Sequence, residues 1–133
     1  MVRAPVTLTF LFLVAACADI PTATDLLGSW GGDHLLMQVD AVGASLEYDC
    51  ASGTINEPIR PDAMGRFDVL GVHTPGQGGP VRQGEVGPSY AARYVGRVEG
   101  RRMTLTVSLV DTTAVVGTFD LEQGRSGSVW KCL

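Results

Sequence analysis

The sequence predicts an all-β fold, a small antiparallel meander barrel of about seven to eight strands that a disulfide ties together. Glycine is about twice as frequent as in an average domain, with 17 glycines in 133 residues, and charged residues make up only 18%. No stretch keeps helical periodicity for longer than two turns. Turn-forming residues recur roughly every ten positions instead, a spacing typical of antiparallel barrels, in which the strands cover one another's edges.

The amino-terminal half of the domain is predicted to hold a first strand that opens at residues 28–30 and four further strands. These four cover residues 34–40, 44–50, 53–59 and 66–72. The hairpin of the first two turns near Gly43, and period-2 alternation places one apolar face on both of its strands. That face consists of Leu35, Met37, Val39, Leu46, Tyr48 and Cys50. Cys50 is therefore expected to point into the core.

The carboxyl-terminal half is predicted to be a four-stranded meander. Its strands cover residues 91–98 and 103–110, a third strand with Val115, Phe119 and Leu121 on its apolar face, and residues 128–132. On the last strand Trp130 and Cys132 share a face, an arrangement sterically compatible with a disulfide from Cys132 to Cys50 beside a buried Trp. Residues 74–88, with five glycines and three prolines, form a loop of the long kind that is usually functional or mobile.

Residues 1–16 are interpreted as a secretory signal that is cleaved from the mature chain. Arg3 precedes a mostly apolar, uncharged run at residues 6–16. Such a run is too short for a transmembrane helix, which needs roughly 20 apolar residues. Export of the chain is therefore expected.

Residues 14–17, Val-Ala-Ala-Cys, resemble the lipobox of bacterial lipoproteins. The resemblance implies that lipid is attached to Cys17 and that the chain is cut before it. Residues 17–25 would then form a lipidated tether, and residues 26–133 a single β-barrel-like domain. The alternative is ordinary signal-peptidase cleavage after Ala18, which would release a soluble protein.

The cysteine count agrees with lipidation, because three cysteines in an exported chain leave one without a partner. If Cys17 carries lipid, Cys50 and Cys132 remain to pair in an oxidising compartment. The alternative is two separate free thiols. Ala18, rather than an acidic residue, follows Cys17. In bacterial lipoproteins, which residues 14–17 resemble, a non-acidic residue at this position favours the outer membrane over the inner one. The resemblance thus implies a domain that faces the periplasm.

The charge pattern excludes one class of partner. The net charge is −4 and the arginines are scattered, whereas nucleic-acid binding requires a clustered basic face. The expected partners are therefore the membrane, through the amino-terminal lipid, and either a small apolar ligand or an envelope protein.

Gly28-Ser29-Trp30 resembles the Gly-x-Trp signature that opens lipocalins. In that family the Trp closes one end of an eight-stranded barrel, and a basic side chain of the last strand, here Lys131, packs over it. The resemblance implies binding of a small apolar ligand inside the barrel. The alternative is a Trp that serves only to fill the core next to the disulfide.

Residues 48–53, Tyr-Asp-Cys-Ala-Ser-Gly, resemble the Tyr-x-Cys-x-x-Gly motif of membrane-bound inhibitors of c-type lysozyme, which are also small periplasmic lipoproteins. A whole strand precedes the motif here, unlike in that family. Residues 30–34, 49–55, 78–82 and 131–133 together resemble a group of short uncharacterised bacterial envelope proteins. That broader resemblance implies no activity.

Candidate polar sites are few. In the predicted hairpin register His34 faces outward beside Glu47 and Asp49, so this cluster and His73 are candidates for a binding site or, less favoured, for a metal-dependent enzyme. The alternative is exposed polar pairing across strands. No metal-binding or nucleophile motif occurs, so we expect a binding module with no catalytic residues, no bound metal and no cofactor.

Two arginines complete the candidates. Arg82 lies in the glycine-rich loop of residues 74–88. The alternative function is a module that docks a protein or a glycan through this loop, with Arg82 as a candidate contact. Arg93 belongs to a group of arginines on the predicted hairpin of residues 91–98 and 103–110, where a local anion site would be possible. Exposed arginines on a polar sheet face are the commoner arrangement.

Overall fold

The computed structural model describes residue 2 and residues 12–17, 26–77, 79–80, 82–85 and 87–132. Most of the predicted signal, and the predicted tether after Cys17, lie outside these residues. The described part of the chain contains no helix long and apolar enough to cross a membrane. Cys17 is exposed and its thiol is not part of a disulfide.

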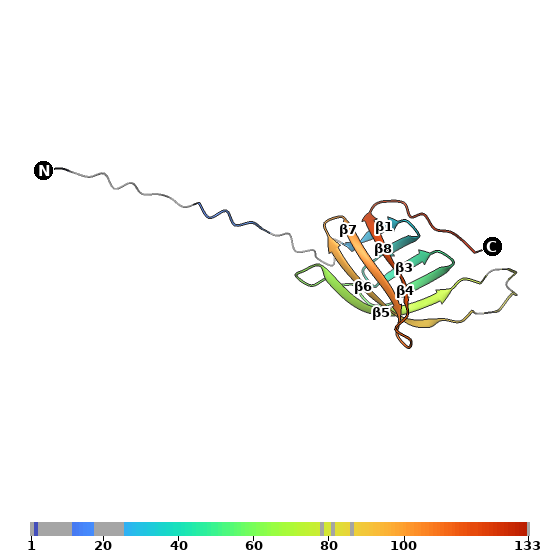
Figure 1. Cartoon of the computed structure of the whole chain (residues 1–133). Helices are drawn as coiled ribbons and strands as arrows, with labels where there is room; N and C mark the ends of the chain where they lie inside the picture. The colour runs from blue at the N-terminus through green and yellow to red at the C-terminus, as the bar shows by residue number, and fades with distance from the viewer. Residues whose placement is uncertain are drawn as a thin grey trace.

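The domain is a closed antiparallel barrel in which each strand pairs with its neighbours in chain order (Figure 1). This confirms the predicted fold class. The strands are β1 (Gly28–Gly32), β2 (Leu35–Val39), β3 (Ala44–Tyr48), β4 (Ala51–Ile55), β5 (Arg66–Pro75), β6 (Tyr90–Glu99), β7 (Arg102–Leu109) and β8 (Val115–Gln123).

Apolar side chains from every strand fill the interior. In β2, Leu35 and Met37 are completely buried, while Leu36 between them is partly exposed and Gln38 is exposed, as the predicted alternation requires. Trp30 and Tyr94 are the largest of the completely buried side chains. The Trp30 ring N–H donates to the carbonyl of Leu26 at 2.8 Å, which satisfies its one polar atom. The barrel axis is therefore occupied by packed side chains along much of its length.

The Cys50–Cys132 disulfide is present, with 4.9 Å between the Cα atoms. The predicted surroundings of this disulfide were wrong. Cys50 is exposed and has a φ of 52°, because it lies in the tight turn between Tyr48 and Ala51, where strand alternation has ended. Trp130 is also not buried, since 70% of its surface is exposed.

The predicted strand at residues 128–132 is absent. This tail forms a single isolated parallel bridge between Ser128 and Asp33. Both backbone groups of Ser128 form hydrogen bonds with the β1–β2 turn. The His34 N–H donates to the Ser128 carbonyl at 2.7 Å, and the Ser128 N–H donates to the Gly32 carbonyl at 3.1 Å. The tail therefore follows the outside of the β1–β2 hairpin instead of adding a strand, and the second half is a three-stranded meander.

Strands β1 and β8 close the barrel over a short seam. Trp30 lies opposite Gln123 and Gly31 opposite Glu122, and no other pair joins the two strands in the part of the chain that the structure describes. β8 continues beyond this seam to Val115, which is 65% exposed rather than on the predicted apolar face. The barrel is thus closed only narrowly between β1 and β8, and β4 likewise pairs only with residues 72–75 at the end of β5.

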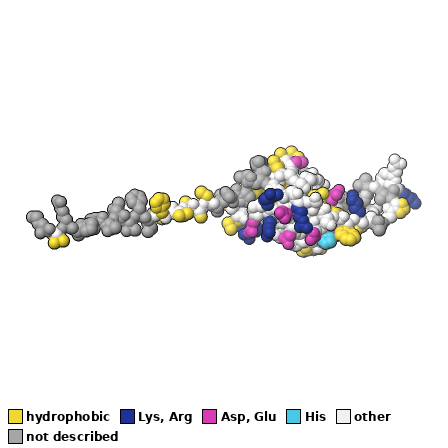
Figure 2. Space-filling model, turned by 90° about the horizontal axis from the view of Figure 1, so that it is seen from above, with side chains coloured by type: hydrophobic (Ala, Val, Ile, Leu, Met, Phe, Trp, Pro, Cys, Tyr) yellow, Lys and Arg dark blue, Asp and Glu magenta, His cyan; other side chains and the backbone are white. Residues whose placement is uncertain are grey.

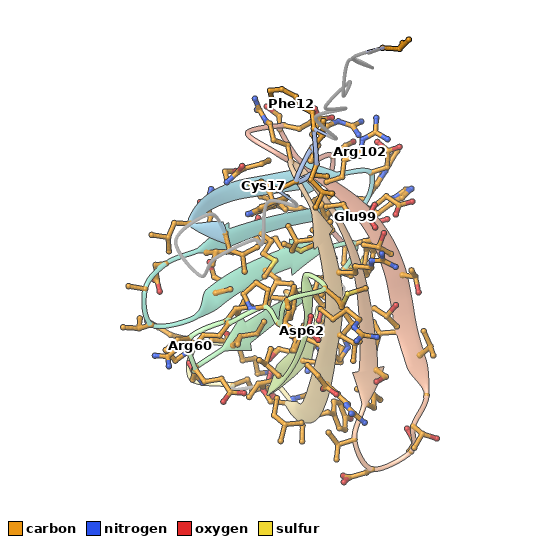
Figure 3. All side chains as sticks on the ribbon, turned by 90° about the vertical axis from the view of Figure 1, so that its left-hand side faces the viewer. Phe12, Cys17, Arg60, Asp62, Glu99 and Arg102 are labelled. Atoms are coloured by element: carbon orange, nitrogen blue, oxygen red, sulfur yellow. A yellow bond between two sulfur atoms is a disulfide. The ribbon has the colours of Figure 1, made fainter. Side chains whose placement is uncertain are left out.

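The two ends of the barrel differ. The chain enters β1 at the end that carries the β2–β3, β4–β5 and β6–β7 connections. Figure 3 looks at the molecule from this side, with Arg60 and Asp62 of the β4–β5 connection and Glu99 and Arg102 beside the β6–β7 turn labelled. The other end carries the β1–β2, β3–β4 and β7–β8 turns and the long β5–β6 loop, which projects away from the amino terminus in Figure 1.

Candidate binding pocket at the open end of the barrel

A pocket of about 740 Å³ opens at the end of the barrel opposite the entry of β1. It lies between β8 on one side and the β1–β2 and β3–β4 turns on the other. Its walls are formed by five stretches of the chain, which include Asp33, His34, Tyr48, Asp49, Ala51, His73, Pro75, Phe119 and Arg125. Both histidines of the chain lie in this wall.

The short seam explains why the pocket forms here. β1 ends at Gly32, while β8 runs on past it toward the β7–β8 turn. Within the described residues, the backbone of residues 116–119 therefore has no strand paired with it on this side, and residues 116–120 form one wall of the pocket. Glycine at position 117 leaves room in that wall for the ring of Phe119, because a Cβ on residue 117 would lie only 2.7 Å from it.

His34 and Asp49 form the first polar pair of the pocket. His34 is the second residue of the tight β1–β2 turn and has a φ of 72°. Its Nδ1 lies 2.6 Å from Asp49 Oδ2, and Asp49 Oδ1 accepts the backbone N–H of Trp130 at 2.8 Å. The carboxylate thus fixes the imidazole, and the disulfide-tied tail fixes the carboxylate. This is the arrangement in which a histidine can act as an oriented hydrogen-bonding group.

His73 and Tyr48 form the floor. His73 is only 7% exposed, its ring stacks on Tyr48 at a centroid distance of 5.4 Å, and the Tyr48 hydroxyl lies 2.5 Å from its Nδ1. Burial lowers the pKa of His73 below its ordinary value. Burial, together with the neighbouring hydroxyl of Tyr94, raises the pKa of Tyr48. Tyr48 therefore stays protonated and His73 neutral near pH 7.

These protonation states determine what the floor offers to a ligand. The Tyr48 hydroxyl lies 2.5 Å from His73 Nδ1 and 3.3 Å from the Ser52 carbonyl, and we assign its proton to the closer acceptor. The His73 proton then resides on Nε2. Every buried polar side-chain atom of the described residues has a partner. His73 Nε2 has no partner within those residues, so this atom is not among the buried ones. It opens on the pocket as a hydrogen-bond donor.

A third polar pair lies at the rim. Arg125 donates to Asp33 Oδ1 at 3.0 Å, and both side chains are at least half exposed. An exposed pair of this kind contributes little to stability. It sets the polarity of the rim on the side of the β1–β2 turn.

The structure brings together three of the residues singled out in the sequence and separates the others. His34, Asp49 and His73 share the pocket, and His73 lies inside β5 rather than at the edge of a loop. Glu47 faces outward on β3, away from this pocket, and lines a smaller groove beside the disulfide. Trp30 is part of the core.

Both candidate arginines lie elsewhere. Arg93 faces outward on β6, where its Nε donates to Asp68 at 2.7 Å. This pair lowers the pKa of Asp68 and raises that of Arg93. Arg82 is exposed in the β5–β6 loop. On the face visible in Figure 2, basic and acidic side chains are interspersed.

Several residues of the pocket were not singled out from the sequence, among them Tyr48 as a polar group, Phe119, Asp33 and Arg125. A signal for the place of His73 does exist. Phe67, Val69, Gly71 and His73 follow period 2, so extending the β5 alternation past residue 72 turns His73 inward. No local pattern indicates Arg125, because the tail reaches the pocket only through tertiary contacts.

Within the described residues no group of three or more His, Cys, Asp or Glu side chains is arranged to hold a metal ion. The fold and the site define a disulfide-tied, eight-stranded antiparallel barrel with a polar-rimmed pocket at one end. Comparison with known protein families, with curated proteins and with solved structures finds no match. The function has to be argued from the site itself.

Proposed function

We propose that the protein is a lipoprotein of the bacterial envelope, anchored through lipid on Cys17, that acts as a binding module. The observation that carries the proposal is the pocket of about 740 Å³ at the end of the barrel remote from the entry of β1. An anchor on Cys17 lies on the amino-terminal side of β1 and would leave the pocket end directed away from the membrane.

The chemistry of the pocket favours a ligand with an apolar group and a hydrogen-bond acceptor. Tyr48, Phe119 and Ala51 supply apolar surface, and the rings of Tyr48 and Phe119 lie 5.9 Å apart. His73 Nε2 offers a donor on this floor. A concave, mostly apolar site with a few placed polar groups is the common form of a ligand site.

A lipocalin-like ligand would have to be small. The side chains below the pocket, among them Trp30, Met37 and Tyr94, are completely buried. A ligand would therefore occupy the mouth of the barrel rather than its axis. Docking of an envelope protein is the second candidate, and the unpaired edge of β8 in the same pocket favours it.

Binding is tested on the full chain, purified from its own envelope in mild detergent, by native mass spectrometry. We expect a co-purifying molecule that is lost from His73→Phe and retained by Arg93→Ala, a matched substitution on the outer face of β6. A bound molecule that His73→Phe retains as well as the wild type does would place the site elsewhere and refute the pocket.

The anchor is tested separately by metabolic labelling with a fatty acid and by membrane fractionation. Cys17→Ser should lose the label and leave the membrane fraction, while Cys50→Ser should keep both properties. Labelled, membrane-bound Cys17→Ser protein would refute the anchor without bearing on the pocket.

A further inference from the structure

The edge of β8 that faces the pocket is unpaired. β7 pairs with β8 from Ser108↔Val115 to Arg102↔Glu122. β1 reaches only Glu122 and Gln123 on the other side. Within the described chain, residues 115–119 therefore have one hydrogen-bonded neighbour strand instead of two. At about 3.4 Å per residue this leaves about 17 Å of open strand edge.

This edge lacks two of the features by which proteins prevent unwanted strand pairing, charge and proline. It carries a third, a bulge, because the β7–β8 register shifts at Val107/Ser108 and leaves Val116 as an extra residue on β8. Natural edges are protected by charged side chains, above all Lys, and by Pro. Residues 112–119, Thr-Thr-Ala-Val-Val-Gly-Thr-Phe, contain neither a charge nor a proline. Val115 is 65% exposed and Val116 36% exposed. A β-branched, uncharged and partly exposed edge is suited to accept another strand.

The pocket lies directly beside this edge. Residues 116–120 form its wall, with Tyr48 and His73 at its floor. Successive side chains of an added strand would point alternately into the pocket and away from it. Backbone hydrogen bonds to β8 would then supply affinity, and the side chain that enters the pocket would supply specificity.

The β1–β2 turn and the tail limit what can enter. Asp33 and His34 of the turn and Arg125 of the tail line the same pocket, and β1 ends beside Asp120 of β8. The turn therefore bounds one end of the open edge, and a strand added to residues 115–119 would continue the line of β1.

We propose that the pocket accepts an extended segment of a partner polypeptide, which adds as a strand to the open edge of β8 and packs an apolar side chain over the paired rings of Tyr48 and Phe119. The inserted segment offers a backbone carbonyl to His73 Nε2. This inference rests on the proposed binding function and names its ligand class.

The test uses the full chain in detergent and a phage-displayed library of short random peptides. Selected peptides are synthesised in two forms, unmodified and N-methylated at alternate residues, and are measured by fluorescence polarisation. N-methylation removes backbone donors and keeps the side chains. We expect affinity to fall by about tenfold or more, since several backbone hydrogen bonds are lost. Amide hydrogen exchange should slow in residues 115–119 when the unmodified peptide binds.

Two matched variants separate the edge from the rest of the surface. Val116→Lys introduces the charge that natural edges carry and should abolish peptide binding. Val95→Lys makes the same change at a comparably exposed site, 41% against 36%. Val95 lies on β6, which is paired on both sides. The Val95→Lys variant should therefore bind peptide as the wild type does. Unchanged melting temperatures confirm that both variants fold.

Four outcomes overturn the inference: a library that yields no binder, equal binding of the N-methylated form, no protection of β8, or a peptide-free dimer formed through the β8 edge. None of them touches the proposed function if a small molecule still co-purifies in a His73-dependent manner. If no small molecule co-purifies and the peptide still binds, the proposed small ligand is refuted and the peptide-binding inference stands.

Discussion

Tyr48 and His73 show how the residues of the floor obtain their properties from burial. Each side chain would be an ordinary polar group on the surface. Inside the barrel mouth they satisfy one another, because the Tyr48 hydroxyl lies 2.5 Å from His73 Nδ1. An unpaired polar group at this depth would cost more than a hydrogen bond gains. The pair therefore depends on both of its members.

Tyr48→Phe is expected to destabilise the fold by about 1 to 3 kcal/mol, because it leaves the buried Nδ1 of His73 without its partner. Chemical denaturation followed by circular dichroism measures the change. Tyr90→Phe is the control, since Tyr90 is 45% exposed. Equal effects of the two substitutions would show that the hydroxyl of Tyr48 has no special role.

His73 is expected to make stability depend on pH. Burial lowers its folded-state pKa below the ordinary value of 6.5, so the unfolded chain takes up a proton at a higher pH than the folded one does. The contribution is complete above pH 6.5 and is lost as the pH falls from 6.5 to the folded-state pKa. Below that pKa this group causes no further loss.

Urea titrations at a series of pH values measure this dependence. His73→Phe should flatten the change in the unfolding free energy in this window, and His34→Gln should retain it. A slope that His73→Phe leaves unaltered would assign the effect to other groups.

At the scale of strands, glycines on β4 and β5 make room for the tyrosines of the interior. A Cβ on Gly53 would collide with the hydroxyl of Tyr94 and would lie 3.2 Å from that of Tyr48. The Tyr94 hydroxyl in turn donates to the Val72 carbonyl at 2.7 Å, across β5. The placement of two large polar rings in a narrow barrel thus requires a strand without a side chain beside them.

Gly53→Ala is therefore expected to destabilise the barrel by about 1 to 3 kcal/mol through overpacking. The shift should be visible in thermal unfolding. Ser52→Ala, the adjacent and outward-facing position on β4, is the control and should stay near the wild type. If Gly53→Ala is as stable as the control, Tyr94 can move aside and the glycine is dispensable.

At the scale of the whole molecule, the disulfide connects the tail to the β3–β4 turn and so completes the pocket. Cys50 and Cys132 are 82 residues apart in the chain. The cross-link also holds the segment whose Trp130 N–H fixes Asp49. Covalent closure therefore serves both the stability of the domain and the orientation of His34.

Replacing both Cys50 and Cys132 by Ser should lower the unfolding free energy by about 4 to 5 kcal/mol, because the unfolded chain is released from a long loop. Urea denaturation measures the loss. Cys17→Ser is the control, since Cys17 is exposed and outside any disulfide. A loss below about 1 kcal/mol would mean that the closed loop constrains the unfolded state little.

The sequence by itself determined the all-β class and most of the hairpins, because alternation and turn residues are local properties of the chain. The pairing of Cys50 with Cys132 was an expectation from the cysteine count, with two free thiols as the alternative, and the structure contains the disulfide. Leu35, Met37 and Leu46 face the core as their spacing requires, and Gly100 has a positive φ of 60° in the predicted turn.

The tertiary structure alone decided the pocket. Three features depend on which residues lie opposite one another when the first and last strands close the barrel. They are the place of His34 and His73 in one pocket, the course of the tail along the β1–β2 hairpin, and the short β1–β8 seam. That register is set by packing over the full length of the chain. The spacing of apolar and turn residues along the chain does not predict this register, and so the open edge of β8 is visible only in the folded molecule.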